Sequence, residues 1–169
     1  MRYQFAVPEF DLIAPILIVF GVACLGVLLE AFVPRAYRFV LQSTLAAVSL
    51  FVAMGFTVVN WQAGRFTPVV SDALMLDGPT YFIWSMLLVF ALFSLLLFGE
   101  RQLGGGASTF AAAAASVPGS KQEADLAKAR LEHTEVFPLA LFSLTGMMAF
   151  PAANDMLTMF VALEVMSLP

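Results

Sequence analysis

The apolar stretch NDMLTMFVALEVMSLP, from Asn154 to Pro169, contains a carboxylate well inside its predicted helix. Glu164 lies nine residues beyond Asp155, and a rise of about 1.5 Å per residue places it near the middle of a bilayer. An ionised carboxylate there costs between about 3 and about 15 kcal/mol. We therefore predict that Glu164 is a proton-translocation relay. The alternative is a neutral glutamic acid that hydrogen-bonds to a neighbouring helix.

Glu30 is a second candidate for proton transfer. It lies three residues before the end of the first apolar run and close to Arg35. One interpretation is that its side chain snorkels to the cytoplasmic surface along its own apolar stem. The other is that it lines a cytoplasmic half-channel or contacts a neighbouring subunit.

The composition identifies the class of protein around these carboxylates. The chain is 61% hydrophobic and 12% charged, whereas soluble domains are about half apolar and about a quarter charged. This indicates a membrane protein, with the lipid bilayer as its surroundings and no nucleic acid as partner. Cys24 is the single cysteine, so the sequence lacks the ligand clusters of iron–sulfur or zinc sites, and no metal is expected.

Five apolar runs predict an all-α, polytopic membrane helix bundle that forms a single membrane domain over residues 1–169. The first three runs have the roughly 20 residues that a membrane helix needs, and the fourth run is shorter. The last run has 15 residues, about 22 Å of helix, so we expect this chain to be the N-terminal part of a longer protein. The predicted spans are residues 12–33, 39–61, 80–98, 136–150 and 155–169 (truncated), and residues 62–79 are predicted to be a loop.

Between the third and fourth spans, residues 104–132 form a predicted cytoplasmic linker and polar helix. Basic residues determine the predicted orientation, because Lys and Arg favour cytoplasmic loops. We therefore expect loops 34–38 and 99–135 in the cytoplasm and the N-terminus outside, in a bacterial inner membrane. One set of loops holds Arg35, Arg38, Arg101, Lys121, Lys128 and Arg130, and the other holds Arg2 and Arg65.

The segment from Val136 to Pro169 resembles a known family. Its short helix, its Asn154-Asp155 turn and its following helix with Glu164 are similar to subunit N of the bacterial proton-pumping NADH–quinone oxidoreductase, respiratory complex I. Subunits L and M and the multisubunit cation/proton antiporters share this pattern. The ending Met166-Ser167-Leu168-Pro169 favours the subunit N family over these paralogues.

The resemblance implies a subunit of roughly fourteen helices in the membrane arm. Such a subunit couples electron transfer from NADH to quinone with proton translocation, and Glu164 matches the family's glutamate of the fifth span. NADH, flavin, iron–sulfur clusters and quinone are then expected in other subunits, with no redox centre in this chain. The implied partners are the other membrane-arm subunits, including the antiporter-like paralogues. The alternatives are a cation/proton antiporter subunit and a non-transporting membrane scaffold.

Overall fold

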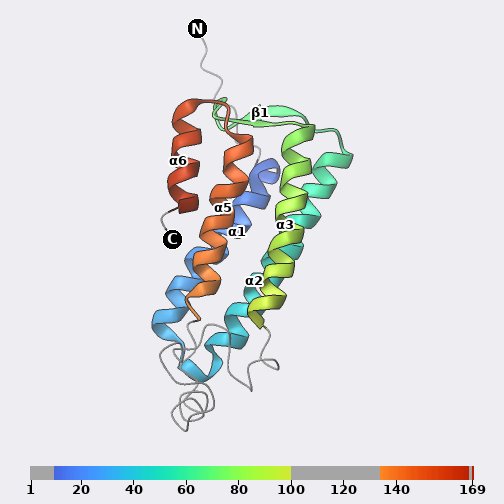
Figure 1. Cartoon of the computed structure of the whole chain (residues 1–169). Coiled ribbons are helices and arrows are strands. Elements are labelled where there is room, and N and C mark those ends of the chain that lie inside the picture. Colours follow the sequence, from blue (N-terminus) through green and yellow to red (C-terminus); the bar gives the residue numbers. More distant parts are fainter. Residues whose placement is uncertain (1–9, 100–133, 168) are drawn as a thin grey trace.

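The computed structural model describes residues 10–99, 134–167 and 169, and this part of the chain is a bundle of five helices (Figure 1). Three helices are long and apolar enough to cross a membrane, and two are shorter and apolar. The predicted all-α membrane fold class is therefore confirmed. The long helices are α1 (Phe10–Phe32), α2 (Arg35–Gln62) and α3 (Gly78–Gly99), and the shorter ones are α5 (Val136–Ala152) and α6 (Met156–Ser167).

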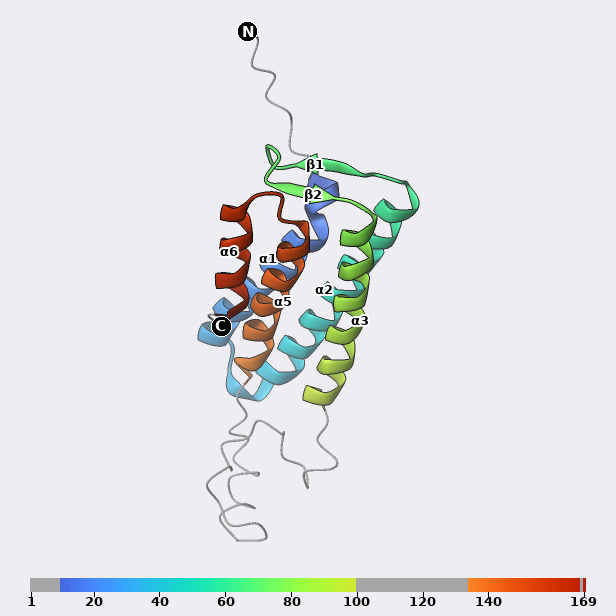
Figure 2. The ribbon, with the colours of Figure 1, turned by 45° about the horizontal axis from the view of Figure 1, so that its top comes forward.

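Helix α5 occupies the centre of the arrangement. It packs along α1 on one side and against α3 and α2 on another, while α6 folds back beside it as an antiparallel neighbour (Figures 1 and 2). Small side chains at the contacts allow the helices to approach closely, as is usual in lipid. Ala23 of α1 and Ala46 and Ala53 of α2 are almost completely buried. The interior therefore depends on close backbone approach as well as on large apolar side chains.

The turn between α1 and α2 is shorter than the sequence predicts. Helix α2 begins at Arg35, directly after Pro34, whereas we expected its span to begin at Phe39. Pro34 is the residue before the helix and has the non-helical backbone typical of that position, with φ −59° and ψ 140°. Helix α5 likewise continues through Pro151, which was expected in the following turn. A proline in the last helical turn removes one hydrogen bond and leaves the rest of the helix intact.

A two-stranded antiparallel hairpin covers one end of the bundle, inside the segment predicted as a loop (Figure 2). Its strands are β1 (Thr67–Val69) and β2 (Leu74–Leu76), each too short to show a periodic pattern. The side chains of Val69 and Leu76 are buried against the helices, which stabilises the hairpin. The loop prediction for residues 62–79 is therefore wrong in this part.

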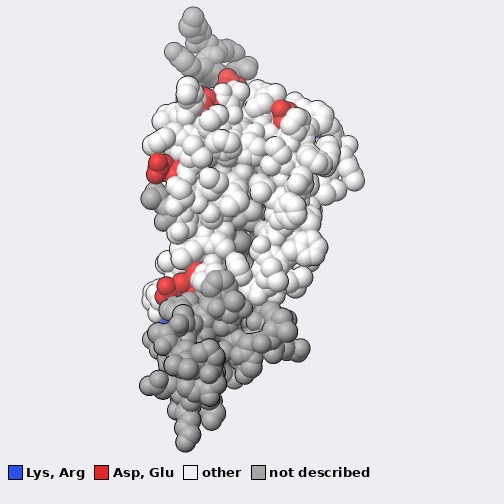
Figure 3. Space-filling model, viewed as in Figure 1, with Lys and Arg blue, Asp and Glu red and all other residues white. Residues whose placement is uncertain are grey.

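Charged side chains concentrate toward the ends of the bundle. Figure 3 shows a largely uncharged face, with acidic groups near both ends and at the side of α6. This distribution agrees with an apolar belt that lies in a membrane. The predicted linker and polar helix at residues 104–132, and most of the basic residues used for the orientation, lie outside the described residues.

Candidate functional site

The position of Glu164 follows from the way α6 begins. Asp155 caps the helix, because its Oδ1 accepts a hydrogen bond of 2.8 Å from the Thr158 amide. Glu164 lies nine residues further along, near the end of the described helix. Its side chain is half-buried, and none of the ion pairs in the described part of the chain involves it.

Glu164 lies at the rim of an open groove of about 430 Å³ between α1, α5 and α6. The carboxylate is the only ionisable side chain in its lining, so the groove walls offer no opposite charge to stabilise the ionised form. The remaining lining residues are Phe20, Leu139, Phe142, Val161, Val165 and Pro169.

The contact between α5 and α6 determines which way Glu164 points. Ser143 Oγ donates a hydrogen bond of 2.7 Å to the Met166 carbonyl, and Gly146 lies against the α6 backbone. Residues two positions apart on a helix differ by about 200° in direction. Glu164, two residues before Met166, therefore projects away from the α5 contact and lies at the rim of the groove.

Glu30 lies in a polar cluster built from three parts of the chain. Its Oε1 accepts hydrogen bonds from Arg38 Nη1 at 2.9 Å and from Thr134 Oγ1 at 2.7 Å. Its Oε2 accepts a hydrogen bond of 3.3 Å from Gln42 Nε2. The Glu30 side chain is only 15% exposed within the described chain. The carboxylate joins α1 to α2 and to the segment before α5.

Gly26 allows α1, α2 and the start of α5 to pack closely together. Gln42 Nε2 donates a hydrogen bond of 2.7 Å to the Gly26 carbonyl. A Cβ on Gly26 would stand 2.9 Å from both Gln42 Oε1 and Pro138 Cβ, which is too close. Glycine at this position therefore positions the amide of Gln42 and the start of α5 against α1.

Our sequence analysis missed Arg38, Gln42 and Thr134 as partners of Glu30. A signal was present in part, because Glu30 and Arg38 each lie four residues from Pro34. Residues at equal distances from a tight turn face each other in a helical hairpin, and Gln42 follows Arg38 by one helical turn. No comparable signal identified Thr134.

A second groove, of about 370 Å³, opens beside the Glu30 cluster. Glu30, Arg38 and Glu135 supply its charged lining, and the rest is apolar. The two carboxylate grooves thus differ, because the first contains an isolated carboxylate and the second contains two carboxylates and a guanidinium.

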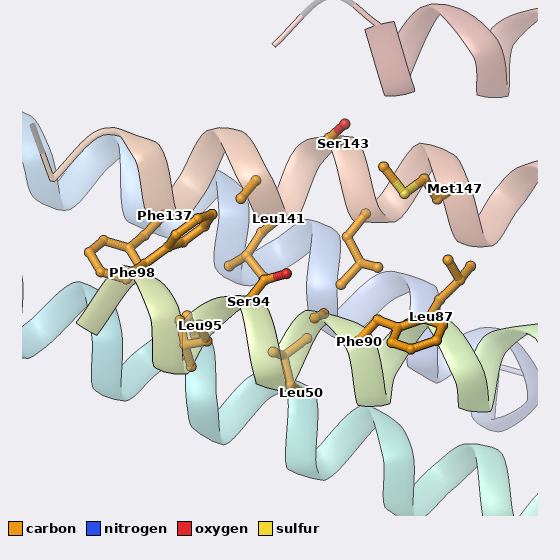
Figure 4. Close-up of a pocket in the computed structure, with 14 residues that line it drawn as sticks. Leu50, Leu87, Phe90, Ser94, Leu95, Phe98, Phe137, Leu141, Ser143 and Met147 are labelled. Atoms are coloured by element: carbon orange, nitrogen blue, oxygen red, sulfur yellow. The ribbon is translucent and has the colours of Figure 1, made fainter. Parts of the chain in front are cut away.

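A third cavity, of about 330 Å³, lies between α2, α3 and α5 and has no ionisable lining residue (Figure 4). Phe90, Leu95 and Phe98 approach it from α3, and Phe137 and Leu141 approach it from α5. Ser143 Oγ points away from this cavity, in agreement with its bond to α6. Within residues 10–99 and 134–167, no group of His, Cys, Asp or Glu side chains is arranged to hold a metal ion.

Polar contacts at the hairpin end hold the helices in place. Asn60 Nδ2 donates to the Asp11 carbonyl at 2.9 Å, and Arg65 forms an ion pair with the Asp11 carboxylate. Trp84 Nε1 donates to the Met148 carbonyl at 2.7 Å and ties α3 to α5. These contacts are at the opposite end of α1 from the Glu30 cluster.

Comparison with known proteins shows extensive similarity to one kind of subunit. The chain is 50% identical to the NADH-quinone oxidoreductase subunit N of a Nocardioides species over 169 residues, which cover 95% of this chain and 32% of that relative. It is 51% identical to subunit N of Acidothermus cellulolyticus, with 95% of this chain and 31% of the relative covered. For the Mycobacteroides abscessus protein the identity is 44%, with 95% and 32% covered.

No family model matches the sequence. The chain spans about a third of the length of the curated relatives it matches.

Proposed function

Because the chain belongs to the subunit N family of NADH-quinone oxidoreductases, we propose that it forms part of the membrane arm of such a complex and takes part in proton translocation. The resemblance of residues 136–169 to this family is confirmed by the identity of 50% over nearly the whole chain. In this proposal, NADH, flavin, iron–sulfur clusters and quinone are bound by other subunits.

The proposal of proton translocation rests on the position of Glu164. A carboxylate with apolar neighbours is neutral when it is isolated from water, and it ionises when water or a positive charge approaches. Glu164 would therefore accept a proton, hold it in the membrane and release it when the environment of the groove changes. The position at the rim, away from the α5 contact, leaves the carboxyl accessible to a group beyond the described residues.

The uncovered face of α6 supports the proposed partners. Leu157 and Phe160 are 73% and 59% exposed, although they belong to an apolar helix. The relatives are about three times longer, so further helices of the subunit or a neighbouring membrane-arm subunit, including an antiporter-like paralogue, would cover this face. We propose a bacterial inner-membrane location, with the Pro34 turn in the cytoplasm and the hairpin outside.

The substitution Glu164→Gln tests the proposed role, because it removes the ionisable group and retains the shape. NADH-driven proton uptake is measured in membrane vesicles with matched amounts of assembled complex. We expect uptake and its coupled NADH oxidation to fall strongly, because a positioned proton-transfer group contributes about 10²–10⁴-fold to a rate. Glu164→Asp, which retains a carboxyl group, should preserve more activity.

The control is Asp72→Asn. Asp72 is an exposed acidic residue of the hairpin turn, and it is distant from both carboxylate grooves. Its substitution should leave proton uptake unchanged. If Glu164→Gln pumps as the wild type does, Glu164 is a structural hydrogen-bonding residue and the proposed role is wrong.

A further inference from the structure

The two grooves that contain carboxylates adjoin each other along α5. Among their lining residues, Leu139 belongs to both. On one side it adjoins the groove of Glu30 and Glu135, and on the other it adjoins the groove of Glu164. In the described chain, the groove that contains charged side chains and the groove of the Glu164 carboxylate therefore share one apolar side chain.

The surroundings of Leu139 hold its backbone and leave its side chain room to move. Its amide donates to the Glu135 carbonyl at 3.2 Å, and the preceding Pro138 is buried against Gly26. The Leu139 side chain, in contrast, is 41% exposed. A leucine with one open side changes between staggered rotamers readily, and exposed rotamers exchange within nanoseconds.

The groove lining beyond Leu139 is apolar except for Glu164. Phe20 of α1 and Phe142 of α5 form an edge-to-face pair with ring centroids 5.7 Å apart. Both rings line the Glu164 groove together with Leu139. Apolar side chains such as these offer water no hydrogen bonds, so they oppose the formation of a water chain along them.

We propose that Leu139 is a hydrophobic barrier that controls proton transfer between the Glu30–Glu135 groove and Glu164. This rests on the proposed role of Glu164. With Leu139 in its present rotamer, the two grooves are separate. When the side chain turns aside, a water chain joins them, an O–H bond of a protonated donor in the first groove breaks, and an O–H bond forms on the Glu164 carboxylate. No electron is transferred, and Leu139 is a positioning residue.

Arg38, Gln42 and Thr134 give the first groove a fixed boundary. They hold the Glu30 carboxylate by three hydrogen bonds, so this group keeps its place while protons move. Glu135 is exposed at the mouth of the groove and is suited to collect protons from water. The barrier therefore lies between a proton-collecting mouth and the buried relay.

Two substitutions of opposite size in the intact complex test the barrier. Leu139→Ala should open it, so that vesicles become permeable to protons and the ratio of protons moved to NADH oxidised falls while NADH oxidation continues. Leu139→Trp should close it, with loss of coupled pumping and no increase in passive permeability. A purely structural role would change the amount of assembled complex and leave the ratio unchanged.

The control is Leu163→Ala, because Leu163 is 40% exposed on α6 and lies outside both grooves. It should retain the wild-type ratio. Adding Glu164→Gln to Leu139→Ala should remove the leak, because the acceptor is gone. A leak that persists in the double variant would overturn the proposed route.

The results separate this inference from the proposed function. If Glu164→Gln is defective and both Leu139 variants behave as wild type, the function stands and the barrier is overturned. If Glu164→Gln pumps normally, the proposed function itself fails. Should Leu139→Ala not assemble, Leu139→Trp decides alone, with reduced pumping in the assembled complex supporting the barrier and normal pumping overturning it.

Discussion

Gly146 of α5 and Ala162 of α6 are in direct backbone contact, since a Cβ on Gly146 would stand 2.7 Å from the Ala162 carbonyl oxygen. The backbone nitrogen of Met166 lies closer still to the same position. Because backbone atoms cannot move aside as a flexible side chain does, this contact sets the rotation of α6 about its axis. It thereby sets the direction of Glu164.

The close contact predicts that Gly146→Ala destabilises the packing of α6 against α5. Forcing a methyl group into a packed contact costs about 1–3 kcal/mol, so the apparent Tm of the purified complex should fall by several degrees. Gly55→Ala in α2 is the matched control, because nothing lies within 4 Å of its added Cβ. The control should be neutral or slightly stabilising, since alanine favours helix by about 1 kcal/mol over glycine. Equal Tm values for Gly146→Ala and Gly55→Ala would show that the contact does not limit the stability of this helix pair.

The ion pair of Glu30 and Arg38 predicts a second effect on stability. Arg38→Gln leaves the mostly buried Glu30 carboxylate without its cation, which should cost about 1.5–3 kcal/mol. The double variant Glu30→Gln/Arg38→Gln should recover part of this loss, because two neutral amides replace an uncompensated charge. Thermal unfolding of the single and double variants gives the coupling energy. Strictly additive losses would show that the pair does not contribute as a unit.

The cap of α6 predicts a pH dependence. Hydrogen bonds from the backbone and side chain of Thr158 hold the pKa of Asp155 below its usual 3.8. The ionised cap therefore stabilises the helix start fully above pH 3.8 and loses its effect as the pH falls below 3.8 through the lower folded-state pKa. The protection of the Thr158 amide against hydrogen exchange should decrease in that acidic range.

Asp155→Asn is the control for this titration. Asparagine also caps helices and does not ionise, so the protection of the Thr158 amide should be independent of pH in the variant. The protection factor already corrects for the intrinsic pH dependence of exchange. A variant that loses protection as steeply as the wild type would exclude titration of Asp155 as the cause.

The proposed orientation predicts the accessibility of two exposed turns. In a Cys24→Ser background, Ser71→Cys in the hairpin should react with an impermeant maleimide from the outside. Tyr37→Cys, in the first turn of α2, should react only from the cytoplasm; Tyr37 is 70% exposed. Labelling of this subunit in right-side-out and inverted vesicles measures the accessibility of both introduced cysteines. The reverse pattern would invert the orientation.

The sequence by itself determined the helices, because the properties that make a membrane helix are local. Long apolar runs, Pro34 between the first two, and the Asn154-Asp155 start of the last are all readable along the chain. The same local pattern identified Glu164, since a carboxylate in an apolar run is conspicuous without knowledge of its neighbours. The hairpin at residues 67–76 was not predicted, because its strands of three residues are too short to show a periodic pattern of apolar residues.

Tertiary structure decided what surrounds each carboxylate. Hydropathy is the same whichever way a helix is rotated, and only packing selects the rotation. Gly26 brings Gln42 and Pro138 against α1, and this enables Glu30 to bind Arg38 and Thr134. Leu139 is one leucine among many in the sequence. It acquires a distinct position only because α1, α5 and α6 meet around it and place the two carboxylate grooves on either side.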